Sequence, residues 1–139
     1  MNGTIKWVDN VMFVAKSGTG HSIVLDGAPE GGGQNAGMRP MELMALSVAS
    51  CSSYDVLTIL KKARQEILSC EAEVEAVRVD SVPSVFESIH LHFKIVGIGL
   101  AKKQVDRAIE LSADKYCSAS IMLKNSGVKV THDYEIIER

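Results

Sequence analysis

The sequence predicts an α+β fold, in which strands pair as hairpins and helices gather on one side of them. Three observations indicate it. The first 25 residues hold three short runs rich in β-branched and aromatic residues, one long apolar helical segment spans Leu43–Leu60, and two segments of alternating polarity follow. Most of these strands are neighbours in sequence, whereas a doubly wound fold alternates single strands with helices.

The three N-terminal runs are Thr4–Val8, Met12–Lys16 and His21–Leu25, separated by turn-forming residues. Their spacing predicts a three-stranded meander. The next segment, Asp26–Met38, shows no periodicity, includes three consecutive glycines and carries little apolar surface. We expect it to be a mobile surface loop that could cover a site.

A long helix is expected after that loop. Pro40 suits its first turn, and the charge of Glu42 complements its dipole. From Leu43 to Leu60 the residues are apolar or small around nearly the whole circumference. A domain of this size rarely surrounds such a helix alone, so we expect a second subunit to help cover it.

Two strands are predicted next, each with one face toward water. In the first, which begins at Cys70, small or apolar residues alternate with glutamates, and the phase slips after Ala76 as it does at a β-bulge. The second, Phe86–Val96, alternates in the same way. Asp80–Ser84 provides the turn between them.

The C-terminal part is expected to contain a helix over Leu100–Tyr116, a shorter helix from about Cys117 to Asn125, and a last strand over Val128–Ile137. The element order is then β-β-β-α-β-β-α-α-β. No repeat or linker interrupts it, and 139 residues suit a single core. We therefore expect one domain, residues 1–139.

Charge and targeting signals narrow the function classes. The chain has 15 basic and 17 acidic residues, and the basic ones are scattered, so neither nucleic acid nor a membrane surface is an expected partner. The N-terminus does not resemble an export signal, and no uninterrupted apolar run approaches the length of a spanning helix. Three widely spaced cysteines argue for thiols kept reduced. We expect a cytoplasmic protein in which any disulfide is functional.

The three cysteines differ in their surroundings. Cys70 occupies the inward face of a predicted strand, where cysteine usually acts as a small hydrophobe. Cys51 lies among small and hydroxyl residues that could donate hydrogen bonds to a thiolate, although Asp55, one turn later, would repel it. Cys117 lies near a helix start, where N–H groups favour a thiolate. For Cys51 and Cys117, simple packing of a small residue remains an alternative interpretation.

Two stretches carry a family resemblance. Pro40–Leu46, leading to Cys51, and Leu111–Ser118, containing Cys117, resemble the two signature regions of the OsmC/Ohr family, and the similarity covers essentially the whole chain. The resemblance implies an intertwined homodimer with central helices packed at the interface beside the active sites. It also implies that Cys51 reduces an organic hydroperoxide and becomes a sulfenic acid, which Cys117 converts to a disulfide. An external dithiol then reduces the disulfide, without a cofactor or metal.

The match departs from the peroxide-reducing members at one position. Their reactive cysteine is preceded, ten residues earlier, by a glutamate that pairs with an arginine from the N-terminal strands, and here that residue is Met41. Glu42 lies nine residues before Cys51, which on a straight helix places it about half a turn from Cys51, on the opposite face. The first arginine in the chain is Arg39. We expect Arg39, with Glu42 as a further candidate, to support the site.

Other interpretations remain open. A non-catalytic relative could bind a small hydrophobic or electrophilic molecule in a pocket lined by Met41, Met44 and Leu46. The change to Met41 favours this interpretation, and retention of both cysteines favours the peroxidase. His90 and His92 share one face of a predicted strand and could hold a metal, but such pairs more often mark a wet strand face. We expect no metal site.

Overall fold

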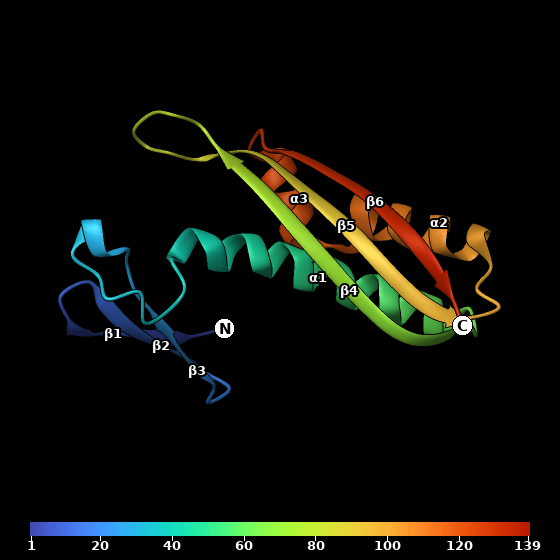
Figure 1. Cartoon of the computed structure of the whole chain (residues 1–139), viewed down its shortest axis with the longest axis horizontal. Helices are drawn as coiled ribbons and strands as arrows, with labels where there is room; N and C mark the ends of the chain where they lie inside the picture. Colours follow the sequence, from blue (N-terminus) through green and yellow to red (C-terminus); the bar gives the residue numbers. More distant parts are fainter. The chain divides into compact units, whose positions relative to one another are not determined.

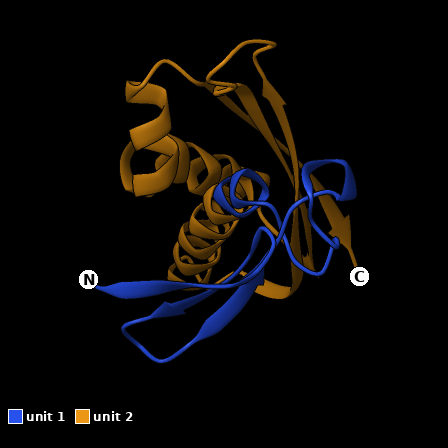
Figure 2. Cartoon of the chain, turned by 90° about the vertical axis from the view of Figure 1, so that its left-hand side faces the viewer, with its two compact units in different colours: residues 1–44 blue, residues 45–139 orange.

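The computed structural model describes residues 1–139 and confirms the predicted α+β class and element order. The chain forms two compact units, Met1–Met44 and Ala45–Arg139, which are coloured separately in Figure 2. Each unit contains one three-stranded sheet. Figure 1 labels the strands and helices along the chain.

The first unit begins with the predicted meander. β1 (Gly3–Asp9) pairs antiparallel with β2 (Met12–Ser17), and β2 pairs antiparallel with β3 (Ser22–Leu25). The predicted boundaries are correct to within one residue. This agreement follows from the clear turn residues between the strands, including Asn10, whose positive φ of 48° suits a tight connection.

The loop after β3 is organised around the side chain of Asp26. This residue is only 3% exposed, and its carboxylate accepts hydrogen bonds from the backbone N–H groups of Gly27, Gln34 and Ala36 at 2.7, 3.0 and 3.0 Å. The bonds from Ala36 and Gly27 hold the pKa of the Asp26 carboxyl below its usual range. The segment is a loop, as predicted, but the buried Asp26 carboxylate holds its glycine-rich part in place through these three bonds.

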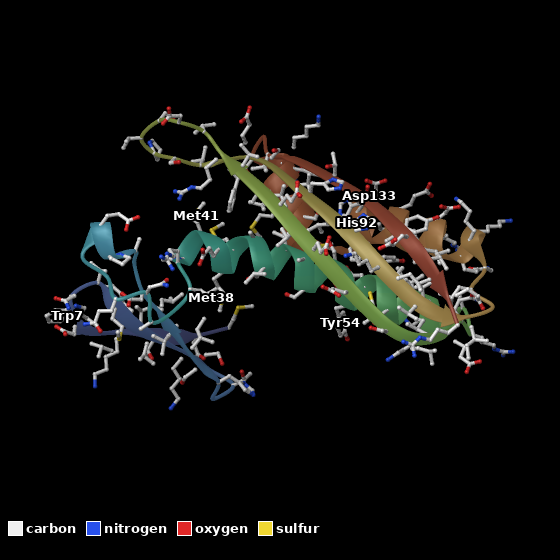
Figure 3. All side chains as sticks on the ribbon, in the orientation of Figure 1. Trp7, Met38, Met41, Tyr54, His92 and Asp133 are labelled. Carbon is white, nitrogen blue, oxygen red and sulfur yellow. The ribbon has the colours of Figure 1, made fainter.

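The long helix α1 (Pro40–Lys62) begins at the predicted proline and has one buried face. Six residues are buried, and they recur at helical spacing: Ala45, Val48, Ala49, Ser52, Val56 and Leu60. Another face leaves Leu46 44% exposed and Tyr54 73% exposed, and Tyr54 projects outward in Figure 3. By length and composition alone α1 could cross a membrane, a test that the central helix of a soluble fold also passes.

The second unit is built on the sheet β4-β5-β6. β4 (Glu66–Arg78) pairs antiparallel with β5 (Phe86–Ile98), and β5 pairs parallel with β6 (Lys129–Glu138). The β4–β5 register shifts between Val77 and Arg78, which confirms the predicted bulge. The parallel pair requires a crossover, which the segment between β5 and β6 supplies.

That crossover consists of α2 (Lys102–Leu111), a π-helical turn (Ser112–Tyr116) and α3 (Ser118–Asn125). The helices of this unit lie on one face of its sheet (Figure 2). Alternate residues of β5 facing the helices are fully buried, and they are Ile89, Leu91, Phe93 and Ile95. The opposite face carries the polar residues, as the alternating sequence predicts.

His132 on β6 makes the fold sensitive to acid. Its ring stacks on that of Phe93, with centroids 6.3 Å apart, and its Nε2 is buried without a hydrogen-bond partner. Burial, followed by the nearby charge of Lys124, lowers the pKa of His132 from 6.5 to about 4. The folded state therefore holds this histidine neutral where the unfolded chain would protonate it.

We expect the free energy of unfolding to fall by about 2 kcal/mol, allowing for partial exposure, as the pH falls from about 6.5 to about 4 and His132 becomes protonated in the unfolded chain. Between these pH values the unfolded state binds more protons than the folded state. The contribution of neutral His132 to stability is therefore fully present above pH 6.5 and is lost progressively below it. Urea unfolding of the wild type and His132→Gln at pH 7 and pH 4.5 measures the difference. His21→Gln, at an exposed histidine, is the control. An equal acid loss in the wild type and His132→Gln would refute this assignment.

Candidate redox site

The structure brings the two predicted reactive cysteines together. Cys51 lies on α1, and Cys117 lies between the π-helical turn and α3. The sulfur atoms of Cys51 and Cys117 and a carboxylate oxygen of Asp55 all lie within 4.8 Å of one another. Both cysteines carry free thiols. Residues far apart in the sequence thus form one cluster inside the second unit.

Cys117 caps the N-terminus of α3. Its Sγ accepts a hydrogen bond from the backbone N–H of Ser120 at 3.4 Å and another from Ser52 Oγ at 3.2 Å. The Cys117 N–H donates to Ser112 O at 2.9 Å, and Ser112 Oγ donates to Ser52 O at 3.3 Å. These bonds join α1 to the π-helical turn and fix the sulfur. π-Helical turns occur often at functional sites.

Burial dominates the acidity of Cys117. Its side chain is fully buried, and this burial raises the pKa of the thiol although the Ser52 and Ser120 bonds lower it. The neighbouring Cys51 raises it further. The predicted N–H donor at the helix start is present, and its bond to Cys117 favours the thiolate as expected, but desolvation outweighs it.

The serine hydroxyl groups next to Cys51 donate hydrogen bonds to other acceptors than the Cys51 sulfur. Ser52 donates to Cys117, while Ser50 and Ser53 donate to the helix carbonyls of Ser47 and Ala49. Cys51 itself is half-buried, whereas Cys117 is fully buried. A small molecule from solution therefore has better access to Cys51 than to its neighbour.

Asp55 faces the same cluster, one helical turn after Cys51. Burial raises the pKa of its carboxyl, and its Oδ2 is buried without a hydrogen-bond partner. The residue also lines a pocket of ≈ 460 Å³ together with side chains from α1 and α2, among them Lys62 and Arg107. The sequence placed Asp55 near the sulfur but did not reveal its unpaired oxygen.

The family model described as "OsmC-like protein" matches residues 31–133, which include both cysteines of the cluster. The chain belongs to the OsmC family. The resemblance inferred from the two signature stretches is thereby confirmed, and with it the OsmC-like fold. This fold is that of a soluble protein.

Relatives of this OsmC-like chain support the assignment over its whole length. Protein YhfA of Escherichia coli (strain K12) is 39% identical over 140 residues, covering 99% of this chain and 98% of YhfA. A structure titled as a hypothetical protein from Aquifex aeolicus VF5 is 29% identical, with a TM-score of 0.81, covering 98% and 96% of the two chains. A Legionella pneumophila structure titled as the organic hydroperoxide resistance protein OsmC has 16% identity and a TM-score of 0.72, with 97% of each chain covered, and shows the shared fold.

The two supporting candidates have partners within the first unit of the OsmC-like chain. The backbone N–H of Arg39 donates to Glu42 Oε2 at 2.9 Å, which satisfies an N–H group at the start of α1. The Arg39 guanidinium donates to Asn35 Oδ1. Arg39 and Glu42 thus interact with each other, through a backbone group, at the start of the helix.

The remaining candidates lie on the sheet of the second unit. Cys70 on β4 is paired with the buried Ile95, and burial raises the pKa of its thiol. On the outer face His90 and His92 both contact Asp133 Oδ1, at 3.2 and 2.5 Å, and His92 and Asp133 are labelled in Figure 3. The pKa of His92 is raised chiefly by its hydrogen bond to Asp133.

Proposed function

We propose that the protein is a thiol peroxidase that reduces organic hydroperoxides. The observation that carries the proposal is the placement of the Cys51 and Cys117 sulfurs within 4.8 Å of each other. Two adjacent free thiols are the minimum set for a peroxidase that protects its own sulfenic acid. Family membership agrees with a redox role for this pair.

Accessibility assigns the two roles. Cys51 is half-buried and attacks the peroxide, while the fully buried Cys117, with its raised thiol pKa, resolves. The Cys51 thiolate attacks the O–O bond of ROOH, an S–O bond forms, and the leaving alkoxide takes a proton to give ROH. The Cys117 thiol then attacks the sulfenic acid, forming the S–S bond and releasing water.

The cycle closes by thiol–disulfide exchange. An external dithiol transfers two electrons and two protons to the Cys51–Cys117 disulfide and becomes a disulfide itself. Such a reductant is available in the cytoplasm, where we place the protein because an odd number of widely spaced cysteines suits a reducing compartment. Organic peroxides are the proposed substrates because the fold-related protein of Legionella pneumophila is described as an organic hydroperoxide resistance protein.

Turnover kinetics test this function. With dithiothreitol as reductant, we expect faster turnover of cumene hydroperoxide than of hydrogen peroxide, and a loss of about 1,000-fold in Cys51→Ser because serine is a far weaker nucleophile. Cys70→Ser, at the cysteine on β4, is the matched control and should retain wild-type rates. Oxidation no faster than that of a free thiol such as glutathione would contradict the peroxidase.

The proposed active unit is a homodimer of single-domain chains. On α1, Leu46 is 44% exposed and Tyr54 is 73% exposed, and neither belongs to the helix face that is buried within the chain. A helix with such an uncovered apolar face favours a second copy of the chain as the cover, because a two-fold axis places the same face on both partners. This is the arrangement that the family resemblance implies.

A second candidate function is binding without catalysis. Met41 replaces the glutamate that the peroxide-reducing members use, and Met44 and Leu46 are 45% and 44% exposed nearby on α1. These side chains would favour a small hydrophobic or electrophilic ligand. Inert thiols in the turnover assay would favour this alternative.

A further inference from the structure

Three potential metal ligands converge at the thiol pair, and one of them has no part in the peroxidase cycle. Cys51 and Asp55 are four residues apart on α1, so their side chains share one helical face. Cys117 reaches the same point from the N-terminus of α3. One ligand atom from each of the three residues lies within 4.8 Å of the other two.

The spacing suits a small divalent ion. Zinc bonds of about 2.3 Å to sulfur and about 2.0–2.2 Å to oxygen place tetrahedral ligand atoms roughly 3.6–3.8 Å apart. The ligand atoms of this cluster, all within 4.8 Å, need to approach one another by at most about 1.2 Å to reach that geometry. Rotation of the half-buried Cys51 and Asp55 side chains can supply such a movement.

The carboxylate of Asp55, which reaches the cluster through one oxygen, also has an unsatisfied atom. Its Oδ2 is buried and has no hydrogen-bond partner. A buried carboxylate oxygen without a donor is costly, and a cation beside it removes that cost. Asp55 also lines the ≈ 460 Å³ pocket between α1 and α2, so its carboxylate borders a space that solvent can reach.

The surroundings of Cys117 are those of a supported metal ligand. Ser52 Oγ and the Ser120 N–H donate to its Sγ at 3.2 and 3.4 Å. In zinc sites, residues that do not touch the metal often donate hydrogen bonds to the metal-binding side chains and orient them. The two bonds to Cys117 would act in this way and would stabilise its thiolate form. Ser112 in turn holds the Ser52 carbonyl at 3.3 Å, so the sulfur sits on a fixed frame.

We propose that the reduced protein binds one zinc-class divalent cation through Cys51, Asp55 and Cys117. The ion displaces one proton from each thiol and changes no oxidation state. Three protein ligands leave the fourth tetrahedral position to water or another small ligand.

Metal binding and disulfide formation compete for the same two sulfurs. As a consequence that rests on the proposed function, the ion would hold the pair reduced and slow its reaction with peroxide. If peroxide oxidises the bound pair, one ROOH and two protons yield the disulfide, ROH, water and the released ion, so atoms and electrons balance. The cation would then regulate the peroxidase by occupying its reduced state.

Cobalt(II) titration of the reduced protein tests the site without an activity assay. We expect one Co²⁺ per chain, with a thiolate-to-cobalt charge-transfer band and the visible bands of tetrahedral cobalt, both removed by Zn²⁺. Cys51→Ser and Cys117→Ser should each lose the two-thiolate spectrum. Asp55→Asn should weaken binding at least about tenfold, and Cys70→Ser should bind like the wild type. Circular dichroism checks that each variant folds.

The outcomes separate this proposal from the peroxidase. Absence of a charge-transfer band in the folded wild type overturns the metal site, even if peroxide turnover is normal. A band of full wild-type intensity in Cys51→Ser, or loss of the band in Cys70→Ser, overturns the ligand assignment. The expected cobalt spectrum supports the site whether or not the protein turns over peroxide, because the titration involves no oxidation.

Discussion

Cys117→Ser is expected to convert a reversible disulfide cycle into irreversible oxidation of Cys51. Peroxide still reacts with the accessible Cys51, but the neighbouring serine cannot attack the sulfenic acid. A second peroxide then yields a sulfinic acid, which the dithiol does not reduce. We expect multiple turnovers to fall at least about a hundredfold while the first oxidation remains fast. Mass spectrometry of the Cys51 peptide should show the gain of two oxygens.

The matched control for that variant is Cys70→Ser. Cys70 lies on β4, opposite Ile95, and its replacement also removes one of the three thiols. This variant should still form the disulfide and avoid sulfinic acid. Wild-type turnover by Cys117→Ser would instead show that another group attacks the Cys51 sulfenic acid. Loss of the first oxidation in this variant would show that Cys117, and not Cys51, is the cysteine that reacts with peroxide.

Leu46→Glu is expected to dissociate the proposed dimer. Leu46 is 44% exposed on α1 and is not part of the buried face of that helix. In a two-fold interface that covers Leu46, the substitution brings one new carboxylate from each partner toward the other. Like charges facing each other across an interface cost several kcal/mol, so the dissociation constant should rise at least about a hundredfold. Sedimentation velocity over a range of concentrations measures this change.

Met122→Glu provides the control for charge alone. Met122 is 69% exposed on α3, outside the exposed side of α1, and the substitution adds the same charge. It should leave the sedimentation coefficient unchanged. A wild-type protein that sediments as a monomer at micromolar concentration would contradict the dimer. The exposed apolar residues of α1 would then not be buried by a second copy of the chain.

Local sequence signals were sufficient for most of the fold. Pro40 begins α1, and the alternating residues of β5 correctly predicted which side chains are buried. The phase slip after Ala76 corresponds to the register shift near Val77. In each case the signal lies within a few residues, where propensity and periodicity act directly.

Long-range pairing could not be read in the same way. The parallel alignment of β5 with β6 depends on the path of α2 and α3, and no local pattern specifies it. The order of the loop after β3 depends on Asp26 accepting bonds from Gln34 and Ala36, eight and ten residues away. A single aspartate in a glycine-rich segment gives no sign of such bonds.

The sequence singled out the two cysteines that lie together in the structure, but not their electrostatic surroundings. The family resemblance pointed to Cys51 and Cys117, and the structure places their sulfurs together. The sequence could not show that Ser52 donates to Cys117 or that burial raises the pKa of that thiol. Both effects depend on the packing of α1 against the π-helical turn, which only the folded chain defines.

Disulfide mapping after limited oxidation tests the redox pair most directly. Reduced protein is treated with one equivalent of cumene hydroperoxide, alkylated and digested without reductant. The account predicts an intramolecular Cys51–Cys117 disulfide, with Cys70 alkylated as a thiol. Recovery of all three cysteines as alkylated thiols, or a disulfide that includes Cys70, would contradict it.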